Sequence, residues 1–219
     1  MPLPSPGGGG AHVLFHRVTT YFGSTEGARV LVVECNNEAG ADIASTLERD
    51  LSVKTTQVLI QQLEDDPGLA AELLAGSDLV VCGFNHVEEF KRIVPQSPVE
   101  IVAVMLKTDV RILNELMQLP PGTKVGFICA NQRSTETFYR ESMFSSGSSL
   151  VKIWAGLDNG IGLQSLLEQC DVIFATSYVY ERVLAIADSS KTIFKVDLSI
   201  DPANVDLIRE RLALACSGK

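Results

Sequence analysis

The stretch Ser77-Asp-Leu-Val-Val-Cys-Gly-Phe-Asn-His-Val-Glu-Glu decides the fold, because its pattern begins again at Cys170-Asp-Val-Ile-Phe-Ala-Thr-Ser-Tyr-Val-Tyr-Glu-Arg. Two further apolar runs recur in the same order and at nearly the same spacing. Val30-Leu-Val-Val-Glu-Cys-Asn returns as Val125-Gly-Phe-Ile-Cys-Ala-Asn, and Ile101-Val-Ala-Val-Met-Leu-Lys-Thr-Asp returns as Ile193-Phe-Lys-Val-Asp-Leu-Ser-Ile-Asp. This internal duplication predicts two copies of one α/β unit, with a cleft between them of the kind that binds small molecules.

From Arg29 onward, β-branched apolar runs alternate with helical periodicity, as expected for parallel βα units. We expect strands at 29–35, 53–60, 78–83, 100–106, 124–129, 151–155, 171–176 and 192–198. We expect helices at 38–51, 65–75, 86–94, 109–118, 132–143, 161–169, 178–187 and 202–215. Runs such as Val30–Val33 are continuously apolar, so helices must cover both sheet faces. Right-handed crossovers then predict a doubly wound, Rossmann-like parallel sheet in each lobe, with strand order 2-1-3-4.

This pattern divides the chain into four segments. They are a linker with a possible extra strand (1–28), a first α/β lobe (29–108), a crossover helix and linker (109–123), and a second α/β lobe (124–219). Proline and polyglycine in residues 1–10 cannot contribute to a packed element. We expect the helices near 109–118 and 202–215 each to pack on the opposite lobe.

Bulk composition narrows the function classes. A net charge of −9 and a pI near 4.8 make nucleic-acid binding by this chain unexpected. No apolar run approaches the ~20 residues that span a bilayer, and the N-terminus lacks a signal-peptide pattern, so we expect no membrane partner. The 5 cysteines form no CxxC pair, which is typical of reduced, buried thiols in a cytoplasmic protein.

The candidate site lies in the loops that follow the first and third strand of each copy. In open α/β sheets, ligands bind at the carboxyl ends of the strands, where the strand order reverses. These loops read Glu34-Cys-Asn-Asn, Gly83-Phe-Asn-His, Cys129-Ala-Asn-Gln-Arg-Ser-Thr and Thr176-Ser-Tyr. The predicted ligand-binding residues are Asn36, Asn37, Asn85, His86, Asn131, Gln132, Arg133, Ser134, Thr176, Ser177 and Tyr178.

Arg133 and the helix starts suggest what this site would hold. A guanidinium is the usual bidentate partner of a carboxylate, and helix N-termini favour anions, so we expect a small polar or anionic metabolite. Other interpretations stay open: the asparagines and serines as helix caps, Arg133 as a surface residue, and His86 as a solvated loop residue. The sequence holds no P-loop, HExxH, GxSxG or spaced metal-ligand motif, and Gly160-Ile-Gly162 lacks the third glycine of a dinucleotide site. We therefore expect no cofactor, no metal and no catalytic residue.

Three segments carry a resemblance to a known family: Ala28-Arg-Val-Leu-Val-Val-Glu-Cys-Asn-Asn-Glu-Ala, Asp78-Leu-Val-Val-Cys-Gly-Phe-Asn-His and Leu119-Pro-Pro-Gly-Thr-Lys-Val-Gly-Phe-Ile-Cys. Over about residues 28–215 the chain resembles the C-terminal effector-sensing domain of bacterial GntR-type transcriptional regulators, which has a periplasmic-binding-protein-like fold. The resemblance implies a ligand-binding domain in transcription regulation, not an enzyme, and a possible homodimer. Such regulators bind DNA through an N-terminal winged helix-turn-helix, for which this sequence shows no segment.

Two alternatives belong to other classes. Cys35-Asn-Asn looks like the Cys-Asn-Thr motif of cofactor-independent amino-acid racemases, which need one thiol from each lobe. The repeat places Ala130 opposite Cys35, and we expect Cys129 to point into the sheet. The second lobe therefore lacks the thiol that a racemase would need. A transport-type solute-binding protein is the third possibility, and the sequence shows no signal peptide for it.

Overall fold

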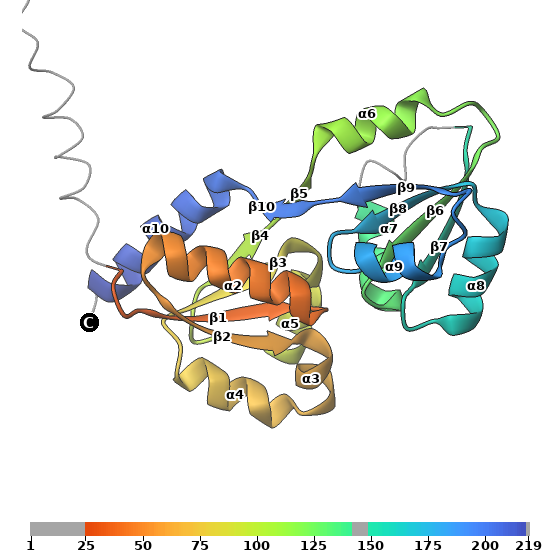
Figure 1. Ribbon diagram of the computed structural model, residues 1–219. Helices are drawn as coiled ribbons and strands as arrows, with labels where there is room; N and C mark the ends of the chain where they lie inside the picture. Colours follow the sequence, from red (N-terminus) through yellow and green to blue (C-terminus); the bar gives the residue numbers. More distant parts are fainter. Residues whose placement is uncertain (1–24, 142–148, 218–219) are drawn as a thin grey trace, which may run out of the picture.

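A computed structural model describes residues 25–141 and 149–217 and folds them into two α/β lobes joined by two crossing segments (Figure 1). The glycine- and proline-rich head and most of the possible extra strand (11–28) lie outside the described residues. None of the described helices is long and apolar enough to cross a membrane.

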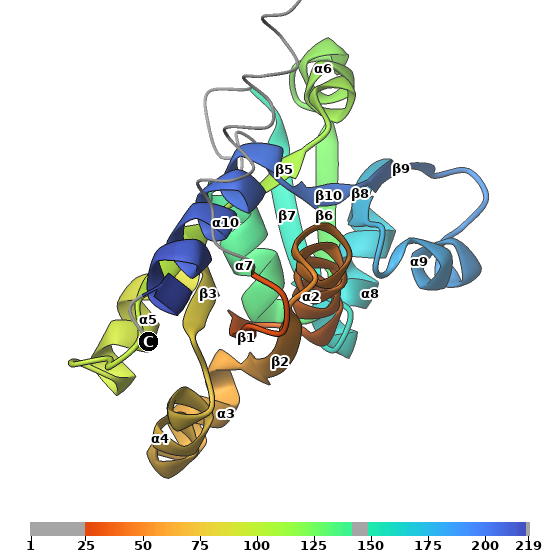
Figure 2. The same cartoon turned by 90° about the vertical axis from the view of Figure 1, so that its left-hand side faces the viewer.

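The first lobe is built on a parallel sheet in the order β2-β1-β3-β4, as predicted. Its strands are β1 (Arg29–Glu34), β2 (Lys54–Leu59), β3 (Leu79–Gly83) and β4 (Ile101–Val104). Its helices are α2 (Asn37–Leu51), α3 (Ile60–Asp65), α4 (Pro67–Ala75), the short 3-10 turn η1 (Phe84–His86) and α5 (Val87–Ile93). Helix α2 lies on one side of β1 and β2, and α3 and α4 lie on the other (Figures 1 and 2).

The second lobe repeats this arrangement, with strand order β7-β6-β8-β9. Its strands are β6 (Lys124–Cys129), β7 (Val151–Gly156), β8 (Val172–Thr176) and β9 (Thr192–Val196). Its helices are α7 (Gln132–Glu141), α8 (Gly160–Gln169) and α9 (Tyr180–Ile186). The duplicated, doubly wound α/β fold predicted from the sequence repeat is confirmed.

The connection between the lobes differs from the prediction. The sequence suggested unbroken strands at 100–106 and 192–198, but each run breaks at Met105 or Asp197 and continues as β5 (Leu106–Thr108) or β10 (Leu198–Ile200). β5 and β10 pair antiparallel, with Leu106 opposite Ile200, and form a narrow ribbon between the lobes. An ion pair between Lys107 and Asp201 ties the two crossing segments together.

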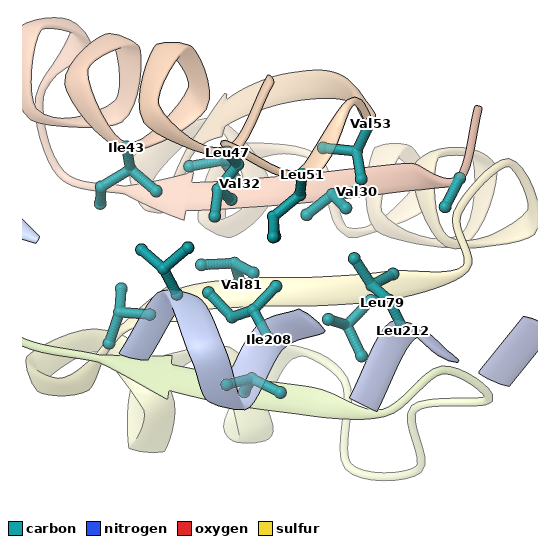
Figure 3. Packing of buried hydrophobic residues seen from close by; sticks show 14 residues of the cluster. Val30, Val32, Ile43, Leu47, Leu51, Val53, Leu79, Val81, Ile208 and Leu212 are labelled. Atoms are coloured by element: carbon teal, nitrogen blue, oxygen red, sulfur yellow. The ribbon is translucent and has the colours of Figure 1, made fainter. Parts of the chain in front are cut away.

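The last helix, α10 (Pro202–Ser217), packs on the first lobe rather than on the second. Its Ile208 and Leu212 are fully buried against strands β1 and β3 and helix α2 (Figure 3). Burying one such side chain stabilises the fold by about 1.5–3 kcal/mol. Residues 124–219 therefore do not form a single lobe, because α10 packs on the first lobe. This position of the terminal helix on the opposite lobe is the one expected from the sequence.

Helix α6 (Val110–Gln118) completes the exchange in the opposite direction. Its Leu116 packs with Val125, Phe127 and Phe174 of the second sheet, next to α7. The other face of that sheet is covered by α8 and α9. Each lobe thus carries a terminal helix that follows a strand of the other lobe, and the chain passes between the lobes through β5 and β10.

Candidate functional site

A cavity of about 120 Å³ lies between the lobes at the carboxyl ends of their strands. Both lobes and the ribbon line it: Glu34, Cys35, Asn36, Ala39, Gly83, Phe84, Asn85, His86, Val104, Met105, Leu106, Thr108, Cys129, Ser134, Thr137, Phe138, Tyr178 and Leu198. Pockets for drug-sized ligands enclose roughly 300–1,000 Å³. This cavity is smaller than those pockets, so in this arrangement it fits only a small molecule. The ribbon gives it apolar walls, and the strand ends give it polar groups.

Five of the predicted ligand-binding residues line this cavity: Asn36, Asn85, His86, Ser134 and Tyr178. They lie together because parallel strands of both lobes end at the same cleft. Sequence reasoning did not select Glu34, Cys35 and Cys129, although they stand in the quoted loops. It also missed Met105, Leu106 and Leu198, because the ribbon that carries them was not predicted.

Asn36 both caps a helix and lines the cavity. Its side-chain oxygen accepts a hydrogen bond from Ala39 N at 2.8 Å, which satisfies a free N–H at the start of α2. Its amide nitrogen donates to Cys35 Sγ at 3.8 Å. The capping interpretation therefore holds for Asn36, and its amide also steadies the neighbouring thiol.

His86 is buried between two carboxyl groups rather than solvated in a loop. Its Nδ1 lies 2.7 Å from Glu89 Oε2, and its Nε2 lies 3.8 Å from Glu34 Oε2. Burial raises the pKa of Glu89, but hydrogen bonds with His86 and Arg133 outweigh burial and lower it overall. An ionised Glu89 only accepts hydrogen bonds, so the Nδ1 of His86 carries the proton that is shared with it.

Arg133 lies outside the cavity lining, which corrects its predicted role. Its guanidinium donates to Glu64 at 2.8 Å and 3.2 Å and pairs with Glu89 at 2.9 Å, and both carboxylates belong to the first lobe. The hydrogen bond from Arg133 is the main reason that the pKa of Glu64 is lowered. With two carboxylates in place, Arg133 closes the lobes on each other and is not free to hold the charged end of a ligand.

Asn131 also joins the lobes instead of lining the cavity. Its Nδ2 donates to Cys35 O at 3.2 Å, while its Oδ1 accepts from Ser134 N at 2.7 Å at the start of α7. The pairing of Asn36 with Asn131 in the two copies thus reflects two helix caps. One of them makes an additional contact between the lobes.

The four remaining predicted residues hold loops in place and lie outside the cavity lining. Asn37 is exposed, and its carbonyl accepts from Gln57 Nε2 at 2.9 Å. Gln132 accepts from Gly156 N at 2.9 Å within its own lobe. The hydroxyl of the fully buried Thr176 donates to Cys129 Sγ at 3.6 Å. Ser177 donates its backbone N–H to Val196 O at 2.9 Å.

Two thiols face the cavity, one from each lobe. Cys35 follows β1 and Cys129 ends β6, and both line the cavity, contrary to the expectation that Cys129 points into the sheet. The expectation failed because Cys129 is the last residue of its strand, where the sheet face gives way to the cleft. Burial raises the pKa of Cys35 to about 12 and also raises the pKa of Cys129, so both are neutral thiols near pH 7.

The hydroxyl of Tyr178 is buried next to the carboxylate of Asp42 in the first lobe, with no well-aligned hydrogen bond to it. Burial, with a contribution from the nearby carboxylate of Asp42, holds the pKa of Tyr178 well above its ordinary value. Buried polar groups in proteins are nearly always hydrogen-bonded. In the wall of the cavity, the neutral O–H of Tyr178 can therefore pair with Asp42 or, after a small rotation of the side chain, with a bound molecule.

One family model and several solved structures are similar to this chain or to part of it. The family described as the YmtS Rossmann-like domain matches residues 126–215, which cover most of the second lobe and most of α10. A mitochondrial ornithine carbamoyltransferase from Coccidioides immitis is similar over 93% of this chain and 89% of its own, with 6% identity and a TM-score of 0.34. A D-isomer specific 2-hydroxyacid dehydrogenase family protein from Klebsiella pneumoniae 342 is similar over 71% and 64%, with 12% identity and a TM-score of 0.27. No curated protein matches the chain.

Proposed function

We propose that this chain is a ligand-binding module whose lobes close over a small polar metabolite, and that it serves as the effector-sensing domain of a transcriptional regulator. The observation that carries the proposal is the inter-lobe cavity, which both lobes line with polar groups. A ligand there touches both lobes at once. It therefore favours the closed arrangement by the difference in its affinity for the closed and open states.

The connection between the lobes supports a hinge. Within residues 25–141 and 149–217, only the β5–β10 ribbon and its flanking residues cross from one lobe to the other. On the cleft side, the lobes meet through Asn131 and Cys35 and through the ion pairs of Arg133. A short ribbon opposite a small set of polar contacts is an arrangement that opens and closes as two rigid bodies.

The lining favours a polar ligand without a strong negative charge. Among the described residues, the cavity is lined by no Lys or Arg, and its one carboxyl side chain belongs to Glu34. The side chains of Asn36, Asn85, Ser134 and Tyr178 offer neutral donors and acceptors. The sequence suggested a polar or an anionic metabolite, and we now propose a polar metabolite without negative charge.

The sensing role brings further proposals with it. A regulator domain of this kind would work in the cytoplasm, which suits the unpaired state of all five cysteines. It would also form a homodimer, so that closure of the cleft changes the spacing of attached domains. The net charge of −9 argues against direct contact between this chain and nucleic acid.

Thermal-shift screening against a metabolite library tests the binding function. A ligand present at 100 times its dissociation constant adds about 2.7 kcal/mol to the free energy of unfolding. Tyr178→Phe should then lower the affinity by roughly 2-fold to 13-fold, the equivalent of about 0.5–1.5 kcal/mol for one hydrogen bond. The matched control is Tyr180→Phe, because Tyr180 packs near Tyr178 but does not line the cavity. A ligand bound equally well by Tyr178→Phe and the wild type would contradict the proposed site.

One observation favours a second candidate, a racemase-like enzyme. Cys35 and Cys129 line the same cavity from opposite lobes, as a two-thiol proton exchange requires. Their raised pKa values count against it, because the thiolate is the active base and little is present near pH 7. Optical rotation of D- or L-aspartate or glutamate, incubated with the protein, separates the two candidates. If the protein racemises either amino acid and Cys35→Ser abolishes this activity, the protein is an enzyme and the proposed binding module is wrong.

A further inference from the structure

We propose that Glu34, Cys35 and His86 form a binding site for a divalent transition metal ion, with zinc as the preferred ion. One carboxylate oxygen, the thiol sulfur and one imidazole nitrogen of these residues all lie within 4.8 Å of one another. All three residues are buried, and all three line the inter-lobe cavity. This site goes beyond the proposed binding of a metabolite and does not depend on it.

The spacing of the three groups suits tetrahedral coordination. Zinc binds sulfur at about 2.3 Å and nitrogen or oxygen at about 2.0–2.2 Å, so two ligand atoms of one ion stand roughly 3.3–3.7 Å apart. His86 Nε2 and Glu34 Oε2 are already 3.8 Å apart. Side-chain rotations that move these two atoms by a few tenths of an ångström, with no backbone change, would bring them to the coordinating distance. The mixed nitrogen, sulfur and oxygen set favours zinc over magnesium or calcium, which prefer oxygen ligands alone.

The surroundings of His86 match those of a metal-bound histidine. Such a residue usually gives its other ring N–H to a carboxylate, which fixes the tautomer and the ring orientation. Here Nδ1 is 2.7 Å from Glu89 Oε2, which leaves Nε2 facing Glu34 with its lone pair free. Glu89 is held in turn by Arg133 of the second lobe at 2.9 Å. The orientation of the proposed ligand therefore depends on a contact between the lobes.

The backbone also makes room for this cluster. A side chain at position 83 would place its Cβ 2.2 Å from Glu34 Oε1, so glycine at the end of β3 lets the carboxylate keep this position. Cys35 N donates to Glu34 Oε2 at 3.1 Å, which holds the carboxylate beside the thiol. Without a metal the Cys35 thiol is neutral, and a thiolate beside the Glu34 carboxylate forms only where a positive charge compensates it; Arg133 is already paired with Glu64 and Glu89. A divalent cation would supply that charge.

Three protein ligands leave the fourth position of a tetrahedral ion open toward the cavity. Zinc sites with three protein ligands hold a water molecule or a bound ligand in that position. The molecule that enters this cavity would then be one with an oxygen or nitrogen donor that can displace water from the ion. Asn36, Ser134 and Tyr178, which line the same cavity, would bind the rest of it.

Titration of the untagged full chain with Co²⁺ alone tests the site. We expect one ion per chain and a near-ultraviolet absorption band from charge transfer between thiolate and cobalt, with Zn²⁺ displacing the cobalt. Cys35→Ser should abolish the band, and His86→Gln should weaken binding at least tenfold. Glu89→Gln should weaken it by about 10-fold to 100-fold while keeping the band at saturation, as expected for a residue that positions a ligand.

Cys170→Ser serves as the control, since Cys170 is a buried thiol of the second lobe that does not line the cavity. It should bind cobalt as the wild type does, and metal-free melting curves show which variants fold. Absence of one-to-one binding, or a band that persists in Cys35→Ser, would overturn the proposal.

Discussion

Removing the guanidinium of Arg133 should open the cleft without touching the cavity wall. Arg133 makes a two-point contact with Glu64 and a further ion pair with Glu89, with 29%, 42% and 26% of the three side chains exposed. Exposed ion pairs contribute about 0.2–1 kcal/mol each, and a bidentate pair lies near the upper end. Loss of both pairs also leaves Glu64 near Glu89 with no cation between them, and like charges repel. We therefore expect Arg133→Ala to disfavour the closed arrangement by about 1–2 kcal/mol, or roughly 5-fold to 30-fold in population.

Small-angle scattering at low ionic strength measures this effect as an increase in the radius of gyration. A fluorescence pair with one dye on each lobe reports the same change as a loss of energy transfer. Ligand affinity should fall in proportion to the closed population, although Arg133 does not line the cavity. The control is Arg49→Ala, which removes the same charge from an exposed pair with Asp50 on α2. If Arg133→Ala keeps the radius of gyration and the energy transfer of the wild type, the ion pairs do not hold the lobes closed.

Three further predictions concern the ion pair between Arg133 and Glu64, the core and the cavity wall. The pKa of Glu64 is lowered in the folded protein, mainly by its hydrogen bond with Arg133, so its stabilising contribution is complete above its unfolded pKa of about 4.3. It should be lost as the pH falls through the lower folded value, and energy transfer between the lobes should drop in that range; the same transition in Glu64→Gln would refute this assignment. Ile208→Ala should lower the free energy of unfolding in urea by about 2–5 kcal/mol, because Ile208 is fully buried on the first lobe, whereas Leu207→Ala, at a half-exposed neighbour, should cost far less. Equal losses in the two variants would contradict the packing of α10 on that lobe. Gly83→Ala should cost about 1–3 kcal/mol and displace the Glu34 carboxylate, as seen in a lower melting temperature, whereas Gly160→Ala, where a Cβ meets no atom within 4 Å, should not. A melting temperature of Gly83→Ala equal to that of the wild type would show that Glu34 does not occupy this space.

The sequence predicts the strands well because their hydrophobic runs repeat. Val30–Val33 and Val125–Cys129 are apolar throughout, and only a strand covered on both faces by helices buries such a run. The repeat then places the loops that follow them at one cleft. This is why Asn36, His86 and Tyr178 appear in the cavity wall as expected.

The parts that sequence reasoning missed depend on distances between segments far apart in the chain. Nothing in the residues around Arg133 shows that Glu64 and Glu89 of the other lobe neutralise it. The strands break at Met105 and Asp197 because at each of these points the chain leaves one sheet and passes to the other lobe. The cluster of Glu34, Cys35 and His86 has no motif spacing, because His86 follows β3, which is far from β1 in the sequence but pairs with it in the sheet.

Hydrogen–deuterium exchange with and without a ligand from the thermal-shift screen tests the central claim most directly. Closure over a molecule in the inter-lobe cavity should slow exchange in both lobes at once, at the backbone amides of residues 35–40, 83–87 and 131–135, and in the β5–β10 ribbon. Amides on the far sides of the lobes, such as those of α4 and α8, should keep their rates. Protection confined to one lobe, or protection at α4 or α8 alone, would contradict a binding site between the lobes.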